Sequence, residues 1–110
     1  MSISTHVLDT ARGGPAAGIP VLLERLDGEW SEVCRGITND DGRLPVLVDV
    51  DTGPGGTWRI TFDTDAYFEA IGVRGFYPFA SIVFRLDAPD EHYHVPLLVS
   101  PFGYSTYRGS

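Results

Sequence analysis

Cysteine is nearly absent from this chain: Cys34 is the only one among 110 residues. One cysteine excludes the internal disulfide framework of small secreted domains and fits a reducing compartment. No histidine lies near Cys34 in the sequence to support it as a nucleophile. We therefore interpret Cys34 as a small residue within a strand.

Positive charge is also scarce, and all of it is arginine. Arg and Lys together number 8 against 15 Asp and Glu, and no lysine is present. The net charge is −7 and the pI is near 4.6. Nucleic acids and anionic membranes would repel this field, so the composition argues against both as partners.

Several targeting and phosphate-binding signals are missing as well. No apolar run approaches membrane-spanning length, and residues 1–6 lack the basic and apolar regions of a signal peptide. The ending Arg108-Gly109-Ser110 is not the Ser-Lys-Leu peroxisomal address. The glycine-rich segment 53–56 lacks the lysine and following helix of a phosphate loop. We expect a cytoplasmic protein.

Turn-forming residues, in contrast, are abundant, with 13 glycines and 8 prolines. Turn signals at short intervals, including those at 53–56 and 88–90, are typical of an all-β sandwich. We predict one domain over residues 1–110 with two sheets of about eight strands in all. The candidate strands are 3–9, 19–26, 31–37, 43–48, 57–62, 80–86, 91–99 and 103–108.

One segment has a helical pattern instead. Residues 63–72 begin with capping residues, carry acid in the first turn and end with glycine, which predicts a short helix near 64–71. Just before it, Trp58, Ile60 and Phe62 alternate with polar residues, so we expect these three on the core face of a strand.

Alternation along 91–99 determines where two of the three histidines point. The apolar side of this strand faces the core and consists of Tyr93, Val95, Leu97 and Val99. The other side then faces outward and consists of His92, His94, Pro96 and Leu98. Such a face is unusual for a monomer and indicates contact with another subunit. An enclosed histidine pair could titrate near neutral pH and act as base or acid.

The last residues also carry chemistry. Tyr104, Thr106 and Tyr107 favour a strand, so we expect the tail to be held in a sheet. Arg108 and Ser110 would then occupy fixed positions instead of moving freely in solvent.

Two catalytic alternatives remain open from the residues alone. His92 and His94 could ligate zinc with His6 as a third ligand, although no carboxylate or cysteine has ligand-like spacing. A Ser-His-Asp hydrolase would need Ser110 as nucleophile, and the sequence has no Gly-x-Ser-x-Gly motif. Alone, His6 and Arg43 read as ordinary surface residues.

These residues become chemically coherent if His6, Arg43, His94 and the tail converge, because a histidine can deprotonate water and arginine can stabilise an oxyanion. Four segments also resemble one family: residues 3–9, 39–43, 92–102 and 107–110. They are similar to the 5-hydroxyisourate hydrolases, the transthyretin-like enzymes of urate breakdown. The closing Tyr107-Arg108-Gly109-Ser110 is the feature that separates these enzymes from transthyretin.

The resemblance implies a transthyretin-like sandwich that hydrolyses 5-hydroxyisourate, and nothing in the set of His6, Arg43, His94 and the tail requires a metal or an organic cofactor. It implies a catalytic set, a substrate-binding set and a homotetramer with active sites at the interface between dimers. The catalytic set is His6, Arg43, His94 and Ser110; the substrate-binding set is Tyr107, Arg108 and, with a less certain role, His92.

Two other classes remain as alternatives. One is a carrier of small aromatic ligands without catalysis, although the polar groups of His6, Arg43 and His94 would be costly to desolvate for an apolar ligand. The other is a structural module whose outer sheet face only holds partner chains together. Depletion of 5-hydroxyisourate in an ultraviolet assay separates the enzyme from both.

Overall fold

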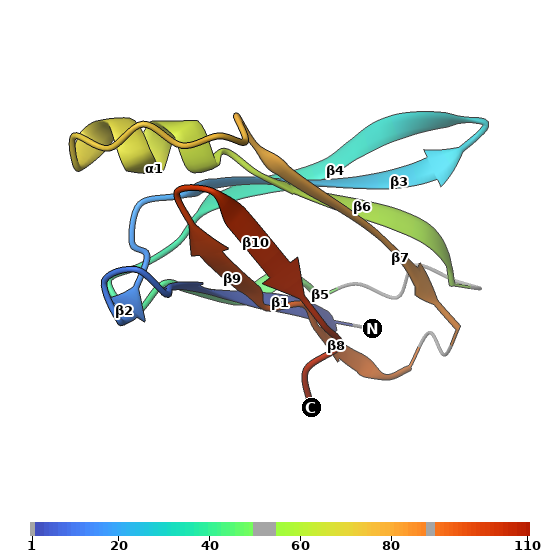
Figure 1. Ribbon diagram of the computed structural model, residues 1–110. Helices are drawn as coiled ribbons and strands as arrows, with labels where there is room; N and C mark the ends of the chain where they lie inside the picture. The colour runs from blue at the N-terminus through green and yellow to red at the C-terminus, as the bar shows by residue number, and fades with distance from the viewer. Residues whose placement is uncertain (1, 50–54, 88–89) are drawn as a thin grey trace.

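The computed structural model describes residues 2–49, 55–87 and 90–110, which form two packed β-sheets and one short helix (Figure 1). The first sheet contains β1 (Ser2–Asp9), β2 (Gly14–Pro15), β5 (Arg43–Asp49), β8 (His92–His94), β9 (Leu97–Ser100) and β10 (Gly103–Thr106). The second has the order β4 (Glu29–Ile37), β3 (Pro20–Asp27), β6 (Gly56–Phe62) and β7 (Ala80–Leu86). The predicted two-sheet, all-β architecture is confirmed. The turns predicted at 53–56 and 88–90 lie partly outside the described residues.

The core lies between the two sheets and follows the predicted alternation. Trp58, Ile60 and Phe62 on β6 have no exposed surface. The apolar residues of the other sheet meet them from β1, β8 and β9, and include Ile3, Val7, Tyr93, Leu97 and Val99. Because successive side chains of a strand point to opposite faces, the remaining residues of β1 and β8 lie on the outer face of the six-stranded sheet.

The predicted helix is α1 (Thr64–Ala70), which connects β6 to β7. The Asp63 carboxylate caps it by accepting a hydrogen bond from the Ala66 N–H. The Tyr67 hydroxyl donates to the buried Asp9 carboxylate at 2.8 Å and so ties the helix to the end of β1. In the part of the chain that the structure describes, no helix has the length and apolar character of a membrane span.

β1 organises the six-stranded sheet. It pairs antiparallel with β5 on one side and parallel with β8 and then β9 on the other. The parallel pairing joins the beginning of the chain to residues about ninety positions later, and no local pattern in the sequence indicates it.

Three details differ from the prediction: an additional short strand, the division of the strand 91–99, and the burial of Pro96. The described residues form ten strands, because the two-residue β2 was not expected and the predicted strand 91–99 is divided into β8 and β9. Pro96, predicted to face outward, is buried. A proline has no N–H for the ladder, so the strand breaks there and Val95, Pro96 and Leu97 are buried in succession.

Candidate active site

The outer face of the six-stranded sheet collects polar side chains from three distant segments. On β1, Ser2, Ser4 and His6 alternate with the buried Ile3, Thr5 and Val7. His6 lies opposite Arg43 of β5, Ser4 opposite His94 of β8, and Ser2 opposite His92. The register of β1 against its two neighbours therefore places the predicted residues side by side.

Arg43 is positioned by the turn that precedes it. The Asn39 side-chain oxygen accepts hydrogen bonds from the Asp41 and Arg43 N–H groups, both at 3.0 Å. Gly42 has a φ of 73°, a conformation that favours glycine, and its carbonyl accepts from the Val7 N–H at 2.7 Å. A Cβ at Gly42 would collide with the Val7 carbonyl oxygen. The turn thus fixes the start of β5 against β1.

His94 is held by its side chain and its backbone. Its Nδ1 hydrogen bonds to the Ser4 hydroxyl at 2.7 Å, and its carbonyl accepts from the Gly109 N–H at 2.8 Å. Gly109 also lies so close to the ring that an added Cβ would be 2.5 Å from Cδ2 of His94. The tail therefore packs directly on His94, and glycine is the residue that permits this contact.

The tail is held in the sheet, as predicted. β10 pairs with β9, and beyond it Gly109 forms an isolated bridge with His94. Figure 1 shows the C-terminus on the side of β8 that faces away from the four-stranded sheet. This path brings Ser110 to the outer face, where the histidines lie.

A cavity of about 280 Å³ lies at this meeting point. Its lining includes four of the predicted residues, Arg43, His92, His94 and Ser110, and it is completed by Ser4, Thr5 and Pro45. His6 is not part of the lining, but it is the cross-strand neighbour of Arg43. The structure therefore brings together Arg43, His94 and Ser110, with His6 beside them.

The electrostatics of the cavity favour a neutral His94. Desolvation of the ring is the largest cause that holds its pKa below the ordinary value, followed by the positive charge of Arg43 and by His6 and His92. At neutral pH the imidazole then has a free lone pair to accept a proton. A neutral base beside a fixed cation is the pairing that hydrolysis of a carbonyl compound needs.

Tyr107 and Arg108 lie elsewhere within this chain. The Arg108 guanidinium forms an ion pair with Glu91 at 2.8 Å and lies 4.5 Å from the ring centroid of Tyr93. Together with Tyr107 it borders a separate apolar cavity of about 160 Å³, which Ile82, Phe84 and Val95 also line. Neither residue lines the cavity of His94, and their role in substrate binding stays a prediction.

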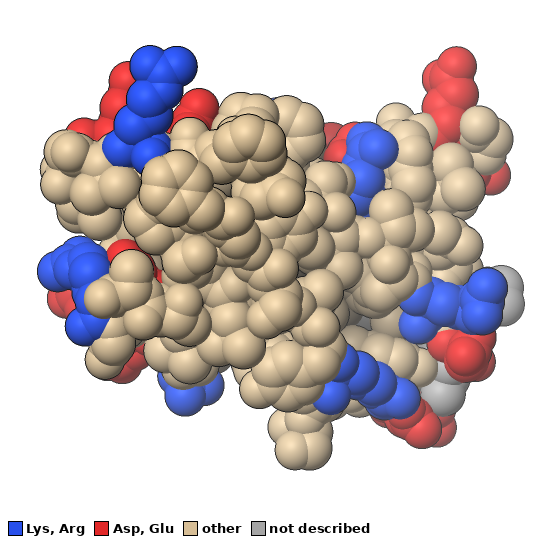
Figure 2. Space-filling model, viewed as in Figure 1, with Lys and Arg blue, Asp and Glu red and all other residues tan. Residues whose placement is uncertain are grey.

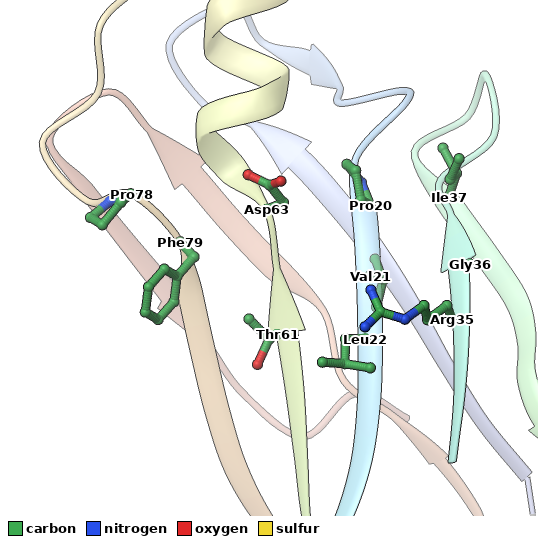
Figure 3. A pocket seen from close by; sticks show the side chains of 10 residues that line it. All are labelled: Pro20, Val21, Leu22, Arg35, Gly36, Ile37, Thr61, Asp63, Pro78 and Phe79. Carbon is green, nitrogen blue, oxygen red and sulfur yellow. The ribbon is translucent and has the colours of Figure 1, made fainter. Parts of the chain in front are cut away.

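A larger cavity, with a volume of about 660 Å³, lies on the outer face of the other sheet. In Figure 3, Pro78 and Phe79 lie on one side of it, Ile37 on the other, and Arg35 extends toward Leu22. Its polar side chains are few, and Arg35 is paired with Glu32 at 2.8 Å. None of the residues predicted for catalysis lines it.

Metal ligation was the main alternative for the histidines. Across residues 2–49, 55–87 and 90–110, no three His, Cys, Asp or Glu side chains form a group that could hold a metal ion. The zinc interpretation of His6, His92 and His94 has no such cluster to support it in these segments.

Sequence reasoning missed two polar residues of the cavity, Thr5, whose hydroxyl donates to the Val95 carbonyl, and Ser4, which contacts the histidines. Alternation along 3–9 would have placed Ser4 on the same face as His6. Its hydrogen bond to His94 depends on the parallel register of β1 and β8, which the sequence does not indicate.

The comparisons with known proteins agree with this fold. A model of the HIUase/Transthyretin family matches residues 3–109. The chain belongs to this family. A 5-hydroxyisourate hydrolase of Mus musculus is 43% identical over 111 residues, which cover 98% of this chain and 94% of the relative.

Solved structures of the HIUase/Transthyretin family superimpose closely. Klebsiella pneumoniae 5-hydroxyisourate hydrolase matches with a TM-score of 0.87 and 36% identity, covering 100% of both chains. Sea bream transthyretin, solved in complex with thyroxine, matches with a TM-score of 0.90 and 31% identity over 99% of this chain and 95% of that one. The fold is common to both groups, so the chemistry of the site has to distinguish between them.

Proposed function

We propose that this protein hydrolyses 5-hydroxyisourate to 2-oxo-4-hydroxy-4-carboxy-5-ureidoimidazoline in urate breakdown. The observation that carries the proposal is the convergence of Arg43, His94 and Ser110 on one cavity, with His6 next to Arg43. The 43% identity with the mouse hydrolase over nearly the whole of both chains supports it.

The geometry supports a reaction in which His94 is the general base. The neutral imidazole accepts a proton from water as the water oxygen bonds to the substrate carbonyl carbon. Arg43 stabilises the negative charge that develops on the carbonyl oxygen. The C–N bond of the cyclic imide-type group then breaks, and the proton passes from the imidazolium to the leaving nitrogen.

Two further residues have supporting roles in this scheme. Ser110 lines the cavity, and in this scheme its hydroxyl hydrogen bonds to the polar substrate. His6 is the cross-strand neighbour of Arg43 and contributes to the lowered pKa of His94. All these groups are side chains of the protein, so the scheme uses neither a metal nor an organic cofactor.

The test is direct. Fresh 5-hydroxyisourate is generated from urate with urate oxidase, and its ultraviolet absorbance is followed with and without the protein. We expect the protein to accelerate the loss, and no acceleration would contradict the proposal. Activity that is abolished by a chelator and restored by zinc would contradict the metal-free scheme alone.

Carriage of a small aromatic ligand is the second candidate, because of the close match to the transthyretin–thyroxine complex. The polar lining of the cavity argues against it, since Arg43 and His94 would lose water without gaining partners from an apolar ligand. Saturable binding of thyroxine without turnover of 5-hydroxyisourate would favour the carrier.

We also propose a homotetramer, a dimer of dimers, with the active sites between dimers. Figure 2 shows an uncharged central area over β7 and β10, with charged side chains around its rim. Exposed aromatic residues from the segments at or next to these strands include Phe76, Tyr77, Phe102 and Tyr104, and Tyr77 contacts Tyr104 edge to face. Such a surface is suited to another subunit. Light scattering that reports a monomer at micromolar concentration would contradict this assembly.

A further inference from the structure

A row of four side chains joins His94 to Ser2, the first residue of β1. The Ser4 hydroxyl lies 2.7 Å from Nδ1 of His94 and 2.9 Å from Nε2 of His92. The second ring nitrogen of His92, Nδ1, hydrogen bonds to the Ser2 hydroxyl. The order is therefore Ser2, His92, Ser4, His94, and Ser4 connects the two rings.

The arrangement follows from the parallel pairing of β1 and β8. Ser2 lies opposite His92 and Ser4 opposite His94, so the two serines and two histidines alternate across one outer face. Ser4 is only 5% exposed, which leaves its hydroxyl little access to water. Its hydrogen bonds are therefore made to the two imidazoles.

The number of protons limits how these bonds can be directed. A serine hydroxyl has one proton to donate, and a neutral imidazole has one N–H and one bare nitrogen. If Ser4 donates to Nε2 of His92, it accepts from Nδ1–H of His94, and Nε2 of His94 is bare. If Ser4 donates to His94 instead, Nε2 of His94 carries the proton and cannot act as a base.

We propose that Ser4 is a positioning residue that holds His94 in the tautomer with Nδ1 protonated and Nε2 bare, and that His92 makes this direction favourable by accepting a hydrogen bond from the Ser4 hydroxyl. The inference rests on the proposed function for its catalytic meaning, since His94 needs a bare nitrogen to take a proton from water. It gives His92 a defined role that does not depend on contact with substrate.

The surroundings of His94 keep its ring neutral, so the tautomer decides whether Nε2 can act as a base. Arg43 on β5, His6 on β1 and His92 on β8 disfavour the imidazolium form, together with burial of the ring. The ring is therefore neutral near pH 7, and only the position of its single proton is left to be set. No described residue hydrogen bonds to Nε2 in the structure, so Ser4 at Nδ1 is the group that sets it.

Ser4→Ala tests the inference with little change in volume. We expect kcat to fall by about 10- to 100-fold, because part of the general-base contribution is lost while KM stays within about two-fold. Ser4→Thr keeps the hydroxyl and should recover most of kcat. Circular dichroism and light scattering establish that each variant folds and assembles as the wild type does.

A spectroscopic readout needs no substrate. Nitrogen-15 NMR of the histidine side chains distinguishes protonated from bare ring nitrogens. In the wild type near pH 7 we expect His94 to carry its proton on Nδ1. In Ser4→Ala we expect a shift toward the Nε2–H form, which free histidine prefers.

His92 supplies the matched pair of variants. His92→Leu removes the acceptor, so the Ser4 hydroxyl donates its hydrogen bond to Nδ1 of His94 instead. We therefore expect kcat to fall by about as much as in Ser4→Ala. His92→Gln retains a side-chain acceptor and should lose less activity than His92→Leu. Equal losses in the two variants would contradict the role given to His92.

The outcomes separate this inference from the proposed function. An active wild type with unchanged kcat in Ser4→Ala would overturn the positioning role and leave the hydrolase intact. A wild-type His94 that is protonated on Nε2 would overturn it as well. If the wild type does not hydrolyse 5-hydroxyisourate, the proposed function fails, and the NMR comparison still decides whether Ser4 sets the tautomer.

Discussion

The cavities on the outer faces of the two sheets differ in volume and in the chemistry of their lining. The four-stranded sheet has the larger cavity, about 660 Å³, lined mainly by apolar residues and by an arginine paired with Glu32. The six-stranded sheet has a cavity of about 280 Å³ that contains Arg43, two histidines and Ser110. A site is therefore better recognised by convergent polar groups with a perturbed pKa than by volume.

Removal of the cation from the smaller cavity should have the largest effect of these tests. Arg43→Ala is expected to lower kcat by about 100- to 1000-fold, because the developing oxyanion loses its fixed partner. The fold should be retained, since Arg43 is an exposed residue of the chain at the start of β5, and we expect the assembly to be retained as well. Steady-state kinetics with fresh 5-hydroxyisourate and light scattering measure both. A variant with wild-type kcat would remove Arg43 from the site.

Deletion of residues 107–110 should leave a folded protein with activity lower by about 100-fold. The core does not need this segment, because Tyr107 and Arg108 are exposed and the buried apolar residues lie upstream. The deletion removes Ser110 from the cavity and the Gly109 bridge from His94. Thermal unfolding and kinetics are compared with those of the full chain, and near-normal turnover would show that the tail is only the end of a strand.

A matched pair of glycines refines that test. Gly109→Ala places a methyl group 2.5 Å from Cδ2 of His94 and should displace the ring or the tail, with loss of activity. Gly103→Ala, on β10, meets its nearest atom, the Ser100 hydroxyl oxygen, at 3.8 Å and should behave like the wild type. Equal activities of the two variants would argue against a close fit between tail and His94.

The pH dependence of kcat should reflect the protonation state of His94. Its pKa is held below the ordinary value by burial and by Arg43, so the neutral, active form persists to lower pH than for an exposed histidine. We expect kcat to rise with pH through this lowered pKa and then to stay level. Arg43→Gln removes one of the lowering causes, and NMR titration should then find the pKa of His94 moved upward; a downward shift would contradict the assigned cause.

The smallest effect on kcat is expected from an arginine-to-alanine substitution on the four-stranded sheet. Arg35→Ala removes the arginine of the larger cavity together with an exposed ion pair, and such pairs contribute about 0–1 kcal/mol to stability. We expect kcat for 5-hydroxyisourate to stay within about two-fold of the wild type. A loss comparable with that of Arg43→Ala would mean that the four-stranded sheet takes part in the reaction.

Local patterns in the sequence predicted the strands, the helix and the outward direction of His94, because alternation and capping are properties of neighbouring residues. Pro96 was placed wrongly, since a proline breaks the ladder and the alternation fails at that residue, although Leu97 and Val99 beyond it are buried as predicted. Local patterns do not predict which distant strands pair or in which register. The pairing of Ser4 with His94 and of His6 with Arg43 depends on strands that are far apart in the sequence. For that reason the catalytic set came from a family resemblance, and Ser4 was missed.

Turnover of 5-hydroxyisourate by His94→Asn tests the central claim most directly, because the claim places the general base at this residue on the outer face of the six-stranded sheet. The variant keeps a polar side chain at a half-buried position and should retain the fold and assembly. The account predicts that kcat falls by about 100-fold or more relative to the wild type under the same conditions. A folded His94→Asn variant that hydrolyses 5-hydroxyisourate at the wild-type rate would contradict it.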